Sequence, residues 1–275
     1  MTLFAYGPSN LQDRFIELIR QQLGERLGPL IEREGPEIRL AGPVSGVGLS
    51  RDAPGRFLRF LERIIRDERN RVELELTSYD RTVHFGDWYG PRQVVDVRDI
   101  EAIRESSEAL TRAGVITHEI AERWHMVSHG FEFAPAVRVV QGRAVRDDTL
   151  RLLDEATFYL PAHEYAIEQE SRVTGWRRVG YHRRELLPQR ARENPRVARA
   201  MRLAGTIPLQ DEFVFEERPD GAGRRGDGWI CHDRGSGHRR VTALLNAWPW
   251  MSVNEEVAEG APASSRDARS HGMGR

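Results

Sequence analysis

The sequence contains no lysine and a single cysteine, Cys231. All 41 basic residues are therefore arginine, which excludes a lysine Schiff base and a P-loop lysine. One thiol can neither form a disulfide within the chain nor build a cysteine-rich zinc knuckle. Any metal ion must therefore be bound by histidine, aspartate and glutamate side chains.

Long hydrophobic runs are also missing. None approaches the about 18–20 apolar residues of a membrane-spanning helix, and the N-terminus lacks the basic start and apolar core of a signal peptide. The formal net charge of −1 gives no global field that would attract nucleic acid or an anionic membrane. We expect a soluble protein without a membrane partner, either cytoplasmic or exported by a dedicated system other than the general secretory route.

Hydrophobic periodicity predicts an α+β chain. A strand is expected at 72–77, a hairpin around Gly90-Pro91 within 82–97, and a second hairpin from 212–217 and 229–232. Residues 35–55 are expected to form a loop, and residues 131–140 a strand or a loop on the substrate side. Asp96 and Asp99 are candidate helix caps. Helices are expected at 9–33, 54–67, 106–128, 147–159 and from Pro161 to Val173.

The segment from Val115 to Gly130 carries the strongest chemical signal. At helical spacing, one stripe holds polar groups and the opposite stripe is apolar, as in a helix that lies on a core and faces a cleft. The polar stripe is His118, Glu122, His125 and His129; the apolar stripe is Ile116, Ile120, Trp124 and Val127.

Glu119 follows His118 and projects about 100° round the helix, within reach of a water bound to a metal on the polar stripe. His-Glu opens the zinc protease signature, in which the second ligand is a histidine one turn later. Here Glu122 takes that position, which gives the variant His-Glu-x-x-Glu. A carboxylate is an acceptable zinc ligand, although it makes the metal a weaker Lewis acid. The alternative interpretation is an ordinary solvated helix face.

The order of helix, strand, hairpin and His-Glu helix resembles the zincin metalloproteases over about residues 45–180, and more narrowly the zincin domains of bacterial effectors and polymorphic toxins. The segment Val95-Asp-Val-Arg-Asp99 contributes to this resemblance. It implies a small mixed sheet packed on a long metal-binding helix. It also implies that a downstream helix, here within 162–173, supplies the third ligand.

The resemblance favours Glu164 as that third ligand, so the expected zinc ligands are His118, Glu122 and Glu164, with Glu119 as the general base. His163 is the next candidate for the third ligand. Neither spacing nor the helical wheel decides between the possible ligands. The remaining candidates are Glu168, Glu170 and, on the first helix itself, His125.

Residues 172–202 carry ten arginines against two glutamates, with Trp176, Tyr181 and His182 between them. Such a cluster favours docking of an acidic protein surface ahead of nucleic acid. A nucleic-acid partner is not expected.

The sequence thus predicts four regions: an N-terminal helix and loop (1–45), a zincin-like domain (46–180), a C-terminal helix and hairpin extension (181–253) and a disordered tail (254–275). The expected function is zinc-dependent hydrolysis of a protein or peptide substrate. The alternative is a non-catalytic zincin-like scaffold, associated with a phage-like or contractile secretion apparatus.

Overall fold

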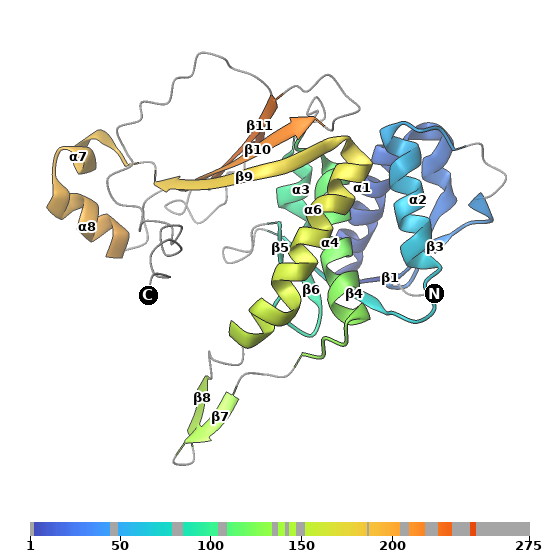
Figure 1. Ribbon diagram of the computed structural model, residues 1–275, viewed down its shortest axis with the longest axis horizontal. Coiled ribbons are helices and arrows are strands. Elements are labelled where there is room, and N and C mark those ends of the chain that lie inside the picture. Colours follow the sequence, from blue (N-terminus) through green and yellow to red (C-terminus); the bar gives the residue numbers. More distant parts are fainter. Residues whose placement is uncertain are drawn as a thin grey trace, which may run out of the picture.

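The computed structural model describes residues 3–44, 49–78, 85–103, 109–133, 137–140, 143–146, 152–185, 187–203, 209–217, 225–232 and 243–245. Most of its core lies between one sheet and a group of helices, an α+β arrangement with a mixed sheet (Figure 1). The expected tail, residues 254–275, lies outside the described residues. Within the described residues, no helix combines the length and apolar character needed to cross a membrane.

Six strands form the main sheet, in the order β2-β3-β1-β4-β6-β5. The three central strands, β1, β4 and β6, run parallel, and the other pairs are antiparallel. Strand β1 pairs with β4. Strands from both sides of the domain boundary expected between residues 45 and 46 therefore belong to this one sheet. The strands are β1 Leu3–Tyr6, β2 Ile31–Glu34, β3 Glu37–Leu40, β4 Val72–Thr77, β5 Gly86–Asp87 and β6 Gln93–Asp96.

One face of this sheet is covered by helices. Along β4, Val72, Leu74 and Leu76 are buried, and they alternate with the more exposed Glu73 and Glu75. This is the two-residue period of a strand with one face on the core. The helices of this layer are α1 Ser9–Leu27, α2 Ala53–Ile65, α3 Val97–Glu101 and α4 Arg112–Ser128, and α6 Leu160–Thr174 packs on α2 and α4.

Helix α4 is the central element. It contacts β4 and β6 of the sheet and packs along α6 on another side. The apolar residues Ile116 and Ile120 are fully buried, and most of the polar residues of the helix are buried as well. The polar stripe predicted to face a cleft is therefore covered by α6 over the first part of α4.

A second sheet packs beside this core, with strand order β12-β11-β10-β9. Phe213 and Phe215 of β10 belong to the main hydrophobic core. The elements of this region are β9 Trp176–Glu185, α7 Gln189–Arg192, α8 Pro195–Leu203, β10 Leu209–Glu217, β11 Arg225–His232 and β12 Ala243–Leu245. The predicted hairpin is confirmed, because β10 and β11 pair antiparallel.

Several other predictions are confirmed. The strand at 72–77 is β4, and β5 pairs antiparallel with β6 across Gly90-Pro91. Asp96 caps α3, because its carboxylate accepts hydrogen bonds from the backbone N–H groups of Arg98 and Asp99. Asp99 does not begin a helix; it lies within α3 and accepts a hydrogen bond from the backbone N–H of Phe85 at 3.3 Å.

Three boundaries differ from the predictions. The helix predicted at 106–128 begins at Arg112, with Thr111 as its cap. The first helix ends at Leu27 instead of residue 33, because Gly28 and Pro29 turn the chain through a 3-10 helix, η1 Gly28–Leu30, into β2. The expected loop at 35–55 contains β3 and the start of α2, whose first turn is capped by Asp52. Strands β2 and β3 have only four residues each and carry charged side chains, so their two-residue period is hard to detect.

The region before α6 also differs from the structure predicted from the sequence. The expected strand at 131–140 is represented by β7 Val137–Val140, which pairs with β8 Arg143–Arg146. The five residues Glu155–Tyr159 form a π-helix, η3, which runs directly into α6. Pro161 therefore lies in the first turn of a continuing helix and does not start a separate one. Residues 147–151, the start of the helix predicted at 147–159, lie outside the described residues.

Candidate metal centre

The close packing of α4 on α6 begins at the first turn of α4. Thr111 caps α4 by accepting a hydrogen bond from the backbone N–H of Gly114 at 2.9 Å. Gly114 leaves room for α6, because a Cβ atom at this position would lie 2.9 Å from the methyl carbon of Thr174. Gly114 therefore allows α6 to lie close against α4.

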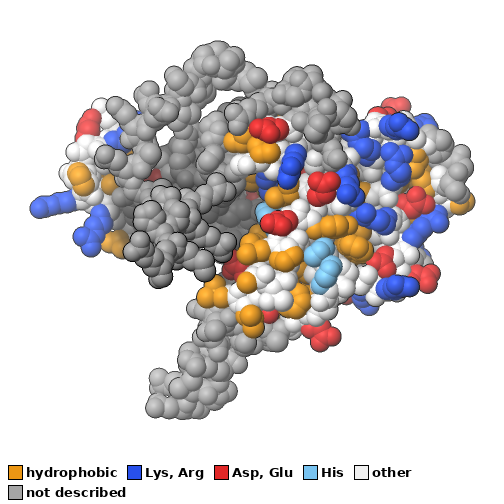
Figure 2. All heavy atoms as spheres, in the orientation of Figure 1, with side chains coloured by type: hydrophobic (Ala, Val, Ile, Leu, Met, Phe, Trp, Pro, Cys, Tyr) orange, Lys and Arg blue, Asp and Glu red, His pale blue; other side chains and the backbone are white. Residues whose placement is uncertain are grey.

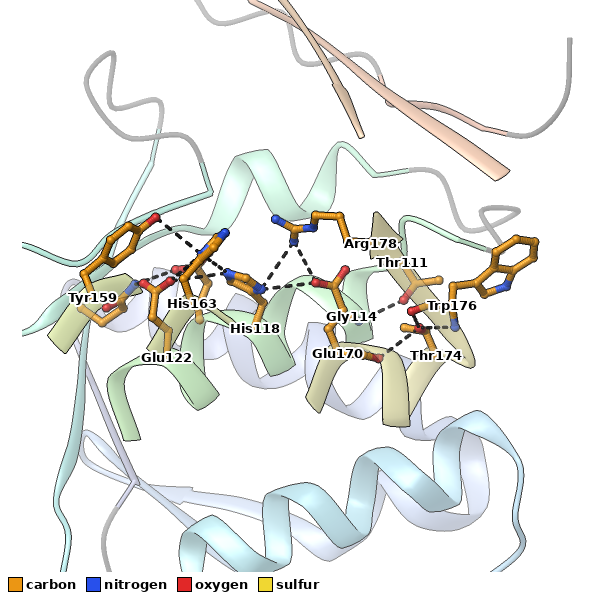
Figure 3. A network of polar contacts seen from close by, with 12 residues as sticks. Thr111, Gly114, His118, Glu122, Tyr159, His163, Glu170, Thr174, Trp176 and Arg178 are labelled. Atoms are coloured by element: carbon orange, nitrogen blue, oxygen red, sulfur yellow. Dashed lines mark hydrogen bonds and ion pairs between the residues drawn. The ribbon is translucent and has the colours of Figure 1, made fainter. Parts of the chain in front are cut away.

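Three side chains from these two helices converge: His118 and Glu122 of α4 and His163 of α6 (Figure 3). Nε2 of His118 lies 3.2 Å from Nδ1 of His163 and 3.5 Å from Oε2 of Glu122. Nδ1 of His163 lies 3.0 Å from the same Glu122 oxygen. A tetrahedral zinc ion with bonds of about 2.0–2.2 Å separates its ligand atoms by about 3.4 Å. The three atoms thus form a triangle of the right size, and this buried group can hold a metal ion.

Hydrogen bonds alone satisfy this triangle poorly. Nδ1 of His163 faces His118, Glu122 and, at 3.5 Å, the hydroxyl of Tyr159. A ring nitrogen carries at most one hydrogen or one lone pair, so it can make one good hydrogen bond among these three. A cation at the centre of the triangle would interact favourably with all of its ligand atoms at once.

The orientation of His118 is fixed from its other side. Its Nδ1 lies 3.3 Å from Oε2 of Glu170, and Arg178 of β9 donates a hydrogen bond from Nη2 to the same oxygen at 2.8 Å (Figure 3). When the Nδ1–H of His118 donates to Glu170, Nε2 carries the lone pair and points toward Glu122 and His163. Metal-binding histidines are commonly held by a carboxylate in this way.

The carboxylate of Glu119 lies beside the three ligands. The side-chain amide of Gln93 on β6 donates to Oε2 of Glu119 at 2.8 Å and to Oε1 of Glu122 at 2.9 Å. On its other side, Glu119 lies against Gly86 of the edge strand β5, where an added Cβ atom would overlap the carboxylate. A glycine in β5 is therefore required for Glu119 to occupy this position.

Two of the three ligand side chains, His118 and Glu122, carry opposite charges in the metal-free protein. Burial and the charge of Arg178 lower the pKa of His118, but hydrogen bonds to the carboxylates of Glu122 and Glu170 outweigh them and raise it to about 9. Burial raises the pKa of Glu122, but hydrogen bonds to His118 and His163 outweigh it and lower the pKa to about 2. At neutral pH His118 is therefore protonated. Its positive charge neutralises the carboxylate of Glu122, as a bound metal ion would.

Glu119 has the opposite shift. Burial and the neighbouring carboxylate of Glu122 raise the pKa of Glu119 to about 7, against the lowering effects of His118, Gln93 and Arg178. A group with a pKa near 7 both accepts and donates a proton efficiently at neutral pH. Glu119 thus has the protonation behaviour that general acid and base chemistry needs.

Tyr159 borders the site from the π-helix η3. Its ring stacks on Trp88 at 4.8 Å, and its hydroxyl points to His163. Burial and the nearby carboxylates of Glu122 and Glu119 raise the pKa of this hydroxyl, so it stays protonated and can donate a hydrogen bond. π-Helical turns often occur at functional sites because they shift the side chains that follow them.

The structure brings together most of the residues predicted from the sequence. His118, Glu119 and Glu122 lie in one buried group. Glu164, the favoured third ligand, is exposed and lies outside this group, and His163 takes its place. The reason is rotation about α6, where successive side chains project about 100° apart, so the two neighbours cannot face α4 together.

The other candidate ligands lie elsewhere. His125 stacks on His129 at 4.0 Å and lies beside the ring of Tyr165. Glu168 forms an ion pair with Arg172 at 3.1 Å. Glu170, also a candidate, contacts His118 and does not belong to the ligand triangle.

Sequence reasoning missed four supporting residues: Gly86, Gln93, Tyr159 and Arg178. Tyr159 lies four residues before His163, a helical spacing that would have placed both on one face. Arg178 was counted within the arginine-rich segment, yet it points inward to Glu170 (Figure 3). Gly86 and Gln93 come from β5 and β6, and no local pattern connects them with α4. No family model, curated protein or solved structure matches this chain.

Proposed function

We propose that the protein is a zinc-dependent peptidase, a hydrolase in which Glu119 serves as general base and acid. One observation carries this proposal: the carboxylate of Glu119 lies beside the triangle formed by His118, Glu122 and His163, where it shares the side-chain amide of Gln93 with Glu122. A structural metal site needs ligands but no additional proton acceptor. The fold assignment that accompanies the proposal is a zincin-like domain with the variant His-Glu-x-x-Glu motif.

The donor set favours zinc. Two imidazoles and one carboxylate are the protein ligands of many catalytic zinc sites, which leave a fourth position free. The side chain of His163 is 31% exposed, whereas those of His118 and Glu122 are 7% and 4% exposed. The open side of the triangle therefore lies next to His163.

Each residue has one task in the proposed reaction. A zinc ion bound here would supply Lewis acidity, which polarises a peptide carbonyl and acidifies a water molecule. Glu119 accepts the proton of that water and then donates it to the leaving amine nitrogen. Glu170 and Arg178 hold His118 in its orientation, and the hydroxyl of Tyr159 is a donor for the oxygen that gains negative charge.

Metal content is the first test. Elemental mass spectrometry of the purified protein should find about one zinc per chain, and His118→Ala and Glu122→Ala should each lose it. Glu164→Ala is the matched control, because this exposed neighbour of His163 should leave the metal content unchanged. A parent protein that binds no metal after zinc is supplied, or a Glu164→Ala variant that loses it, would contradict the ligand set.

Turnover is the second test. Glu119→Gln keeps the shape of the side chain and should keep the zinc, but peptide cleavage should fall by about 10²–10⁴-fold because proton transfer is lost. Cleavage is measured with a library of peptides or with a denatured protein as substrate. Cleavage by Glu119→Gln at the parental rate would show that Glu119 has no such role.

The second candidate function is a non-catalytic scaffold in which the metal only joins α4 to α6. It is favoured by the burial of His118 and Glu122, since structural zinc sites are closed. Under this alternative, metal removal lowers the thermal stability but the metal-bound protein cleaves no peptide. Association with a secretion apparatus, and an acidic partner for the arginine-rich segment, remain predictions of the sequence.

A further inference from the structure

We propose that a pocket between α2 and α6 binds a ligand that carries a phosphate group. The pocket has a volume of about 530 Å³, within the range of small-molecule sites, and the buried residues Phe60 and Val173 line it. Gln169 and Arg172, which line it, lie on a different face of α6 from His163 and Glu170, because successive helical residues are about 100° apart. This pocket is therefore separate from the proposed metal centre.

Among the described residues, four arginines and no carboxylate line this pocket: Arg56, Arg59, Arg63 and Arg172. The three arginines of α2 recur at spacings of three and four residues, which places them on one stripe of the helix. Figure 2 shows several basic side chains gathered over the part of the surface where Figure 1 places α2 and the upper end of α6. The pocket thus concentrates positive charge in a protein whose formal net charge is only −1.

Two of the guanidinium groups are held in place by neutral partners. Arg56 donates from Nε to the backbone carbonyl of Val173 at 2.9 Å. Arg63 donates to the side-chain oxygen of Gln169 at 2.9 Å, and its guanidinium carbon lies 5.5 Å from the ring centre of Phe60. These contacts order the side chains without neutralising their charge. An anion that enters the pocket therefore meets groups that are already positioned, which lowers the entropic cost of binding.

The other two guanidinium groups are exposed. Within the described part of the chain, Arg59 has neither an ion pair nor a hydrogen bond from its side chain. Arg172 pairs with Glu168, but both side chains are well exposed, and such a pair is easily exchanged for a stronger one. Arg59 and Arg172 are thus free to close on a ligand from opposite helices.

The chemistry of the pocket fits a phosphate group better than a single carboxylate. A guanidinium presents parallel N–H donors that match two oxygens of a phosphate, and several guanidinium groups can share its three terminal oxygens and double charge. The phosphate group can belong to a free small molecule or to a phosphorylated side chain of a protein. Both sources present the same group to these arginines.

Isothermal titration calorimetry on the full chain at constant ionic strength tests the proposal, with pyrophosphate and phosphoserine as probes. The parent should bind at least one of them, and Arg59→Gln and Arg172→Gln should each weaken binding by about tenfold or more, since each removes charge-assisted hydrogen bonds. Arg66→Gln is the matched control, because Arg66 lies just after α2 but pairs with Glu62 outside the pocket. The Arg66→Gln variant should bind both probes with the affinity of the parent.

The probes also distinguish the sources of the phosphate group. Tighter binding of pyrophosphate indicates a free small molecule, and tighter binding of phosphoserine indicates a modified protein. No binding of either probe, equal weakening by Arg66→Gln, or tighter binding of a glutamate-rich peptide would overturn the proposal. Glu119→Gln should bind as the parent does, so this result is independent of the proposed peptidase activity.

Discussion

Two pairs of side chains along α4, the second of which ends at the C-cap residue His129, have the same spacing but different surroundings. His118 and Glu122 are four residues apart, and so are His125 and His129. The first pair faces His163 and Glu170 of α6 and joins the ligand triangle. The histidines of the second pair stack on each other, and their neighbour from α6 is Tyr165. The comparison teaches that spacing along one helix brings two possible ligands to the same face. The packing of the opposite helix, α6, decides which of these pairs meets a third ligand.

The largest effect is expected where the two pairs are compared directly. His163→Ala leaves two ligands and should lower zinc affinity by more than the about 10–100-fold typical of lost supporting contacts. His125→Ala removes an imidazole from the same helix stripe and should leave zinc affinity unchanged. Both are measured by competition with a chromophoric chelator. Equal losses in the two variants would mean that the metal lies between the two pairs.

The next effect comes from the support of His118. Glu170→Gln removes the carboxylate that accepts from His118 and Arg178, and it should lower zinc affinity by about 10–100-fold. Glu168→Gln is the control, because this glutamate of α6 forms an ion pair with Arg172 and does not belong to the ligand triangle. The same chelator competition measures both variants. If Glu168→Gln loses as much zinc affinity, the loss comes from removing a negative charge on α6 and not from the contact with His118.

The pH dependence of zinc binding should distinguish the pair His118 and Glu122 from the pair His125 and His129. Because the pKa of His118 is raised to about 9, zinc must displace a proton from it below this pH. Apparent affinity should therefore rise by up to about tenfold per pH unit from pH 6.5 and level off near pH 9. His125, whose pKa is lowered by burial and by His129, should not affect this profile. A flat profile between pH 6.5 and 8.5 would show that His118 is not protonated in the metal-free protein.

The metal-free protein should show the opposite trend in stability. A group whose pKa is raised on folding stabilises the fold below its unfolded value, about 6.5 for histidine. This contribution of His118 is lost as the pH rises through about 9. The thermal midpoint of the metal-free protein should therefore decrease over this range, while His118→Ala should lack that decrease.

The smallest effect concerns the distance between the two helices. Gly114→Ala places a methyl group within 2.9 Å of the Thr174 methyl carbon, and it should lower the free energy of unfolding by about 1–3 kcal/mol. Adding Thr174→Ser removes that methyl carbon but keeps the hydroxyl that bonds Trp176. Urea denaturation should show partial recovery in the double variant. Failure to recover would place the strain at Thr111 or Glu170, the next nearest neighbours.

Local patterns predicted several strongly periodic parts of the fold, but they missed the ten-residue strand β9, which lies within the arginine-rich segment. Strand β4 alternates over six residues, and α2 and α4 have clear helical periods and caps. Strands β1, β2 and β3 escaped detection because each has four residues and long-range pairing stabilises it, including the parallel pairing of β1 with β4. The domain boundary expected between residues 45 and 46 was drawn without these three strands.

For the site, the sequence by itself determined which chemistry was possible. The absence of lysine and the single cysteine restrict the ligands to imidazoles and carboxylates, and the spacing of His118, Glu119 and Glu122 follows from the geometry of one helix. Only the tertiary structure decided that His163, not Glu164, completes the group. The physical reason is that the rotation of α6 about its axis is set by the burial of Ala162 and Ala166 and by the space above Gly114, to which residues far apart in the chain contribute.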